Sequence, residues 1–126
     1  MPQPVVHWEI ASNDAKRLQR FYAELFDWNI DTNNPMHYGI VDAGAGDRSI
    51  NGGIMQTQAG MPQYVTFYVH VDDLQKYLDK AARLGAKPMV PPTPIPDTGS
   101  FAMFADPDGN LIGLFKPLPQ HDGKHA

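Results

Sequence analysis

The chain has no cysteine among its 126 residues. This absence excludes disulfide bonds, thiolate metal ligands and cysteine nucleophiles, and it is compatible with a reducing compartment. No apolar run approaches the roughly 20 residues that a membrane-spanning helix needs, and the first five residues lack the basic start and apolar core of a signal peptide. We therefore expect a cytoplasmic protein that has no membrane partner.

Positive charge is also scarce. Ten Lys and Arg residues stand against 14 Asp and Glu residues, which gives a formal net charge of -4 and a pI of about 5.6. No basic stripe is available to hold phosphate groups, so nucleic acid is not an expected partner. The length suits a single domain that can bury a hydrophobic core of its own.

Apolar periodicity in the sequence predicts two helices and eight strands. The expected helices cover residues 14–26 and 73–84, with Ser12 or Asn13 capping the first and Asp72 the second. The expected strands cover residues 5–11, 28–31, 38–42, 50–56, 64–71, 87–90, 101–105 and 111–115. Residues 91–99 are rich in proline and are predicted to form a loop that borders a ligand cavity and restricts ligand size.

Each predicted helix has an apolar stripe that we expect to lie on a sheet. The members of the two stripes are Leu18, Phe21, Tyr22, Leu25 and Phe26 in the first helix, and Leu74, Tyr77, Leu78, Ala81 and Leu84 in the second. Between the last two strands, Asp106-Pro107-Asp108-Gly109 has the residue types of a tight turn. This tetrapeptide predicts that the last two strands form a hairpin.

The order of elements repeats along the chain. A shift of 59 residues pairs His7 with Thr66, and a shift of 60 pairs Gly53 with Gly113. Each half is then a β-α-β-β-β module, which indicates an internal duplication within one domain. The modules cover about residues 5–57 and 64–116, and a polar tail follows at 117–126. The predicted fold class is α+β, with curled mixed sheets around a cavity between the modules.

Three stretches carry a resemblance to a known family: H-W-E-I-A-S-N-D-A-K-R-L-Q-R-F-Y-A-E-L-F-D-W, V-D-D-L-Q-K-Y-L-D-K-A-A-R-L-G-A and F-A-D-P-D-G-N-L-I-G-L-F. Together they resemble the vicinal oxygen chelate superfamily, which includes glyoxalase I, bleomycin-resistance proteins and extradiol dioxygenases. The stretch P-M-V-P-P-T-P-I-P is similar to the uncharacterised glyoxalase-related branch. The resemblance implies the two-module fold and a homodimer, but the superfamily hosts several chemistries and also non-catalytic binders.

The resemblance also implies where a metal would be bound. Carried over position by position, the four ligands of metal-binding relatives fall on His7, Gly53, Thr66 and Gly113. Only His7 matches, because glycine has no ligating atom, and a divalent ion needs three or four protein ligands. We therefore expect no bound metal and no other cofactor, with His7 as the one retained candidate ligand.

Strand alternation places a small polar group on the predicted cavity face. The candidate catalytic residues are His7, Glu9 and Tyr68; the candidate ligand-binding residues are Thr66, His70, Met55, Phe101, Met103, Gly53 and Gly113. His7 is either a general base or hydrogen-bond donor to a substrate, or a histidine satisfied by Thr66 or Glu9. Glu9 either transfers protons, fixes the tautomer of His7, or is a carboxylate at the rim of the predicted cavity. The two glycines suggest space left for a ligand, or simple loss of a metal site.

Two classes of function remain open. The first is a glyoxalase-like enzyme acting on a small carbonyl or hydroxylated metabolite without a metal, with His7 as acid or base and Glu9 or Tyr68 assisting. The second is a binding or sequestering protein, in which Phe101, Met103, Tyr38 and Trp28 hold an apolar or aromatic molecule. The missing ligands count against a metal-dependent lyase or dioxygenase.

Overall fold

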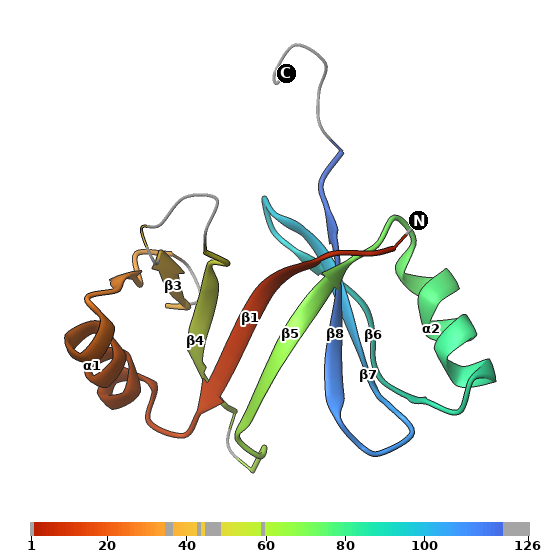
Figure 1. Ribbon diagram of the computed structural model, residues 1–126, viewed down its shortest axis with the longest axis horizontal. Coiled ribbons are helices and arrows are strands. Elements are labelled where there is room, and N and C mark those ends of the chain that lie inside the picture. The colour runs from red at the N-terminus through yellow and green to blue at the C-terminus, as the bar shows by residue number, and fades with distance from the viewer. Residues whose placement is uncertain (1, 35–36, 43, 45–48, 59, 120–126) are drawn as a thin grey trace. The chain divides into compact units, whose positions relative to one another are not determined.

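The computed structural model describes residues 2–34, 37–42, 44, 49–58 and 60–119 (Figure 1). The chain divides into two compact units, which we call the N-terminal unit (Val6–Phe67) and the C-terminal unit (Met1–Val5 with Tyr68–Ala126). No helix among the described residues has the length and apolar character to cross a membrane.

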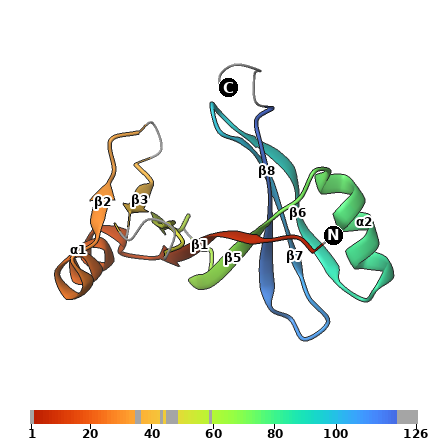
Figure 2. The same cartoon turned by 45° about the horizontal axis from the view of Figure 1, so that its top comes forward.

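The N-terminal unit contains the first β-α-β-β-β module. Its elements are β1 (Val5–Ser12), α1 (Ala15–Phe26), β2 (Asn29–Asp31), β3 (Gly39–Asp42) and β4 (Gly52–Gln56). The strands lie in the order β2-β3-β4-β1, with β1 and β4 parallel and the other pairs antiparallel. Helix α1 packs against β4 and β2, and Figure 2 shows it beside β2. The parallel pair is possible because α1 and the β2-β3 hairpin supply the long connection that such a pair needs.

The C-terminal unit repeats this arrangement. Its elements are β5 (Tyr64–His70, which begins in the N-terminal unit), α2 (Leu74–Arg83), β6 (Lys87–Ile95), β7 (Gly99–Ala105) and β8 (Leu111–Pro117). The strand order is β5-β8-β7-β6, with β5 and β8 parallel, and α2 packs against β6, β7 and β8. The predicted α+β fold of two β-α-β-β-β modules with mixed sheets is thereby confirmed.

Both helices begin one residue later than the sequence predicts. The N-caps are Asp14 and Asp73, whose carboxylates accept hydrogen bonds from the backbone N–H groups of Arg17 and Lys76. Ser12 instead accepts a bond from the N–H of Asp14, at 3.0 Å. An aspartate at the N-cap accepts a hydrogen bond from the N–H group three residues later as well as a serine would. Its negative charge is also favourable near the positive N-terminal end of the helix dipole.

The prediction of a proline-rich loop over residues 91–99 is wrong for residues 91–95. Strand β6 continues to Ile95 and pairs with β7 through Thr93 and Pro94, with register irregularities on either side of Val90. Proline lacks an N–H group, but β6 is an edge strand, where one side of the backbone needs no partner in the sheet. The prolines therefore form the edge of the sheet, and the turn that follows contains Asp97 at φ 64°.

The predicted hairpin between β7 and β8 is confirmed. Asp106 accepts hydrogen bonds from the backbone N–H groups of Asp108 and Asn110 and from the Asn110 side chain, while its carbonyl accepts from the N–H of Gly109 at 2.8 Å. The bonds from Asn110 lower the pKa of the Asp106 carboxyl. Gly109 has φ 91°, which glycine adopts without steric cost.

The two helices differ in how far their apolar stripes are buried. In the C-terminal unit the core consists of Val71, Leu74, Leu78, Ala102 and Leu114. In α1 only Ala15 is buried, and Phe21, Leu25 and Phe26 remain more than half exposed. The prediction that the α1 stripe lies on the sheet is therefore wrong for these three residues.

Truncation of the C-terminal core should be costly. Leu78 is 2% exposed, so Leu78→Ala leaves a cavity and should lower the free energy of unfolding by about 2 to 5 kcal/mol. The control is Leu84→Ala at the end of α2, where the side chain is 71% exposed and the change should stay within about 0.5 kcal/mol. Urea denaturation followed by circular dichroism measures both. Equal losses in the two variants would contradict this assignment of the core.

Candidate functional site

A buried carboxylate lies at the centre of the N-terminal unit. Glu9 is 4% exposed and accepts hydrogen bonds from two tyrosine hydroxyls, Tyr38 at 2.8 Å on Oε1 and Tyr64 at 2.6 Å on Oε2. The Tyr38 hydroxyl also lies 2.9 Å from Nε2 of His7. We call these four residues the Glu9 network. A carboxylate buried this deeply is costly unless it receives such hydrogen bonds.

Three segments of the chain position the four residues of the network. His7 and Glu9 are alternate residues of β1, so their side chains leave the same face of the strand. Tyr64 is the first residue of β5. Tyr38 directly precedes β3, and the Asn34 side chain fixes its backbone by accepting from its N–H at 2.9 Å and donating to its carbonyl at 2.7 Å.

The donors and acceptors of the network determine where its protons lie. A tyrosine hydroxyl has one proton, and that of Tyr38 is donated to Glu9. Nε2 of His7 must therefore carry the proton that is donated to the Tyr38 oxygen. In the neutral imidazole the basic lone pair is then on Nδ1. Nε2, the other ring nitrogen, is held by Tyr38, which is itself bound to Glu9.

Burial shifts the protonation of His7. Removal from water lowers the pKa of the imidazole below its ordinary value of 6.5, and the negative charge of Glu9 opposes this effect in part. Desolvation is the larger cause because it penalises the charged ring. His7 is thus held in its neutral form at neutral pH.

Tyrosine rings cover both of the glycines that the sequence singles out. A side chain at Gly53 would collide with the ring of Tyr38, and one at Gly113 would collide with the ring of Tyr68. Each glycine is therefore explained by the close approach of an aromatic ring to the strand. This corrects the interpretation that the space beside them is left open for a ligand; contact of either glycine with a ligand stays a prediction.

The residues at the implied metal positions do not fit a divalent ion. In the N-terminal unit, Nε2 of His7 is engaged by Tyr38, the ring of Tyr38 fills the space next to Gly53, and the Thr66 hydroxyl donates to the carbonyl of Phe67 at 3.3 Å. Gly113 of the C-terminal unit has no ligating atom. Across the part of the chain that the structure describes, no three His, Asp or Glu side chains form a group that could hold a metal.

The other candidate residues are divided between the units. Thr66 and Tyr68 are buried, at 5% and 7% exposure, whereas Met55 and His70 are partly buried. In the C-terminal unit the ring of Tyr68 meets that of Phe101 edge-on, with 6.3 Å between centroids, and Met103 is buried. The structure thus brings His7 and Glu9 together through Tyr38, while the catalytic role of Tyr68 stays a prediction.

Sequence reasoning missed the roles of Tyr38 and Tyr64. Strand alternation could have found Tyr64, because it lies two residues before Thr66 on the same face of β5. No spacing rule points to Tyr38, which lies outside a strand and is placed by the Asn34 side chain.

A hollow of about 660 Å³ lies elsewhere in the N-terminal unit. Its described lining residues are Asn13, Gln56, Thr57, Gln58, Gly60, Met61 and Pro62. None of them belongs to the Glu9 network. Thr57 donates a side-chain hydrogen bond to Asn13 at 2.6 Å, and Gln56 accepts from the N–H of Ala15 at 3.0 Å, so part of the polar lining is satisfied within the protein.

The contact between Tyr38 and Gly53 can be tested by a double-mutant cycle. Gly53→Ala should lower the free energy of unfolding by about 1 to 3 kcal/mol, because the added methyl group meets the ring of Tyr38. The loss should persist in a Tyr38→Phe background, which keeps the ring, and shrink in a Tyr38→Ala background, which removes it. Thermal and urea denaturation measure the cycle. A penalty that is the same in both backgrounds would show that the ring is not the cause.

The lowered pKa of His7 predicts a pH dependence of stability. The unfolded chain takes up a proton on His7 below pH 6.5, whereas the folded protein does so only at lower pH. This contribution to stability is therefore complete above pH 6.5 and is lost as the pH falls towards the folded pKa. The melting temperature should fall less steeply across this window in His7→Gln than in the wild type. His37→Gln, at an exposed position, is the control; an unchanged slope in His7→Gln would contradict the assignment.

Part of the sequence is similar to that of two curated proteins. Two curated relatives, named "Putative glyoxylase CFP32" and coming from Mycobacterium bovis (strain ATCC BAA-935 / AF2122/97) and Mycobacterium tuberculosis (strain CDC 1551 / Oshkosh), are 36% identical over 76 residues. These residues are 60% of this chain but 29% of each relative, so the match spans less than a third of the relatives' length.

Solved structures of low sequence identity have the same fold. Hypothetical protein BH1468 from Bacillus halodurans C-125 has a TM-score of 0.70 at 12% identity, covering 98% of this chain and 100% of that chain. Methylmalonyl-CoA epimerase from Mycobacterium tuberculosis has a TM-score of 0.64 at 13% identity, covering 91% of this chain and 88% of that chain. A family model matches residues 5–114. The chain belongs to the Glyoxalase/Bleomycin resistance protein/Dioxygenase superfamily.

Proposed function

We propose that this protein binds a small carbonyl or hydroxylated metabolite and transfers a proton to or from it at His7, without the metal ion of its metal-binding relatives. The observation that carries the proposal is the Glu9 network, in which a buried carboxylate is linked through the Tyr38 hydroxyl to a neutral histidine. The names of the curated relatives and of one similar structure, a glyoxylase and an epimerase, are those of enzymes and support this class of chemistry.

Each residue of the network has a defined part in this chemistry. Nδ1 of His7 takes the proton, because Nε2 already carries the one donated to Tyr38. The imidazolium that forms keeps its hydrogen bond to Tyr38, which in turn donates to Glu9, so the carboxylate stabilises the new positive charge. Tyr64 does not contact His7 in the network; it holds the second oxygen of Glu9 and acts as a positioning residue.

Burial of His7 suits it to act as a base. Because its pKa lies below 6.5, the ring is neutral at neutral pH and can act as a base without prior loss of a proton. Glu9 is the one charged group of the network while His7 is neutral. Proton uptake at His7 therefore creates an ion pair, with the Tyr38 hydroxyl between the imidazolium and the carboxylate. This arrangement supports proton abstraction next to a carbonyl group more directly than it supports nucleophilic attack.

The alternative is a protein that binds or sequesters a small molecule without making or breaking a bond. The observation that favours it is the hollow of about 660 Å³, because none of its lining residues belongs to the Glu9 network. On this alternative the network is a polar core that holds β1, β3 and β5 together.

Exchange of carbon-bound protons with solvent deuterium separates these functions without a known product. Purified protein treated with EDTA is incubated in D₂O with a panel of 2-oxo acids and hydroxy ketones, and deuterium uptake is followed by NMR. The proposal expects accelerated exchange of at least one compound, and a loss of about a hundredfold or more in His7→Gln. Tyr64→Phe, which keeps the ring, should reduce the exchange less and change its pH profile.

The same samples distinguish the other outcomes. Binding of a panel compound, seen as a change in tryptophan fluorescence, without exchange and unaffected by His7→Gln would favour the binding protein. Exchange that requires added manganese, nickel or zinc and is lost in His7→Gln would contradict the metal-independent chemistry. Elemental analysis before the EDTA treatment shows whether the protein was purified with a metal.

A further inference from the structure

One side chain holds both backbone groups of Tyr38. The register of β3 with β2 begins at Ile40, and its register with β4 begins at Gly39, so Tyr38 lies before both. The Asn34 side chain accepts a hydrogen bond from the N–H of Tyr38 at 2.9 Å and donates one to its carbonyl at 2.7 Å. A side-chain amide offers the same kinds of donor and acceptor as a peptide group, so Asn34 takes the place of a neighbouring strand residue.

Asn34 is itself held in place by its own backbone. Its N–H donates to the carbonyl of Thr32 at 2.9 Å, and its carbonyl accepts from the N–H of His37 at 3.0 Å. Both backbone groups and both side-chain groups of Asn34 are thus engaged within residues 32–38. The N–H of Tyr38 must face the amide oxygen, so the orientation of the amide is determined as well.

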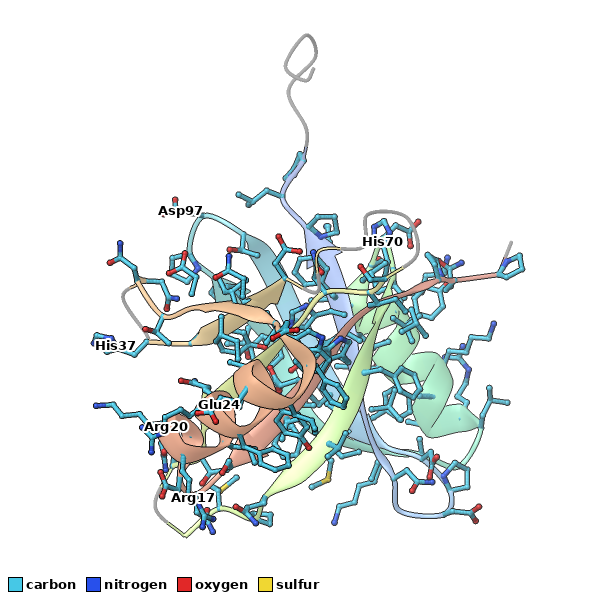
Figure 3. The ribbon with its side chains drawn as sticks, turned by 60° about the vertical axis from the view of Figure 1, so that its left-hand side comes forward. Arg17, Arg20, Glu24, His37, His70 and Asp97 are labelled. Atoms are coloured by element: carbon cyan, nitrogen blue, oxygen red, sulfur yellow. The ribbon has the colours of Figure 1, made fainter. Side chains whose placement is uncertain are left out.

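The backbone at His37 adds a strain that these bonds offset. Its φ is 53°, in the left-handed region that residues other than glycine seldom adopt. Figure 3 shows the exposed His37 side chain projecting outward from the connection between β2 and β3, so packing of the imidazole does not hold this conformation. Such a conformation persists only where the surrounding structure fixes it. Asn34 makes three of the bonds that do so, one to His37 and two to Tyr38.

The hydroxyl of Tyr38 must be placed accurately. It lies within hydrogen-bonding distance of two groups at once, Nε2 of His7 at 2.9 Å and Oε1 of Glu9 at 2.8 Å. The Tyr38 ring lies in the space next to Gly53 and stacks with the imidazole of His7, with 6.2 Å between centroids. A hydrogen bond is lost once donor and acceptor are more than about 3.5 Å apart, so a shift of the Tyr38 backbone by about 1 Å is enough to break one of the two bonds.

We propose that Asn34 is a positioning residue for proton transfer at His7. By holding the backbone of Tyr38, it keeps the Tyr38 hydroxyl between the imidazole and the Glu9 carboxylate. Asn34 acts only through Tyr38 in this role, because its side chain bonds to the backbone of that residue and not to the hydroxyl. This role rests on the proposed function, in which His7 takes up the proton.

Loss of the Asn34 side chain should affect His7 in two ways. Without the Tyr38 hydroxyl in place, the imidazolium formed on proton uptake loses its link to the Glu9 carboxylate, so proton exchange should slow. Without the Tyr38 ring beside it, the imidazole regains contact with water. Because burial is the larger cause of the lowered pKa of His7, with Glu9 opposing it in part, that pKa should rise towards 6.5. A substitution that only weakens the fold would lower the melting temperature without these effects.

The first experiment compares two neighbouring asparagines. Asn34→Ala should slow the deuterium exchange of an active compound by about tenfold or more. NMR titration of His7 without substrate should show its midpoint moved towards 6.5, with the His7 signal assigned by its loss in His7→Gln. Asn33→Ala is the matched control and should change neither readout, because the bond of Asn33 to Asp31, at 2.8 Å, is made by its backbone N–H.

The second experiment asks whether Asn34 acts through the Tyr38 hydroxyl. Tyr38→Phe keeps the ring and removes the hydroxyl, so Asn34→Ala should slow exchange by less than about twofold in that background. Exchange is measured at about pH 8, where His7 is neutral in every variant. Asn34→Asp keeps the acceptor for the N–H of Tyr38 and loses the donor to its carbonyl, so its effects should lie between those of wild type and Asn34→Ala. It replaces Asn34→Ala if circular dichroism shows that the alanine variant does not fold.

Two outcomes would overturn this role for Asn34. The first is a His7 midpoint, or an exchange rate in an active protein, that is the same in Asn34→Ala as in Asn33→Ala. The second is a slowing by Asn34→Ala that is as large in the Tyr38→Phe background as in wild type, because Asn34 would then act by another route. Failure of the proposed function differs from both. A His7 midpoint that moves in Asn34→Ala, in a protein that exchanges no compound, supports the placement of Tyr38 by Asn34 and overturns the proposed proton transfer.

Discussion

The hydrogen bonds to Glu9 are the interaction on which the N-terminal unit depends. A carboxylate at 4% exposure needs donors, and the protein supplies them from Tyr38 and Tyr64, which lie 29 and 55 residues away along the chain. The ring of Tyr38 must then lie against β4, and only glycine at position 53 leaves room for it. One buried charge thus accounts for a glycine and for the tautomer of a histidine.

The sequence alone predicts the two β-α-β-β-β modules but not the hydrogen bonds of the Glu9 network. Helix and strand periods and the turn at Asp106–Gly109 are local patterns that predict local structure, and the correspondence of Gly53 with Gly113 is a repeat that a comparison of the two halves detects. The bond between Tyr38 and Glu9 is not local, because it depends on how the Asn34 side chain fixes the backbone before β3. His7 and Glu9 could therefore be named as candidates for proton transfer, whereas Tyr38 was named only as a ring that holds an apolar ligand and not as the residue that connects them.

Two errors in the sequence analysis come from patterns that have more than one structural solution. Proline runs favour extended backbone, and extended backbone can be either a loop or an edge strand; the place of β6 at the end of its sheet decides between them. An amphipathic period predicts that a helix has an apolar stripe, but not how much of the stripe one sheet covers. Helices α1 and α2 have the same period and differ in that coverage.

The rings over the two glycines restrict how this sequence can change in evolution. Tyr38 covers Gly53 from the position directly before β3, and Tyr68 covers Gly113 from β5, the strand that pairs with β8 in parallel. A carboxylate could be accommodated at either glycine position only if the covering tyrosine were lost in the same step, because each single change leaves a collision or an uncovered strand. In the N-terminal unit that loss would also remove a donor from buried Glu9. Variants that acquire carboxylates at these two positions would therefore pass through intermediates of low stability.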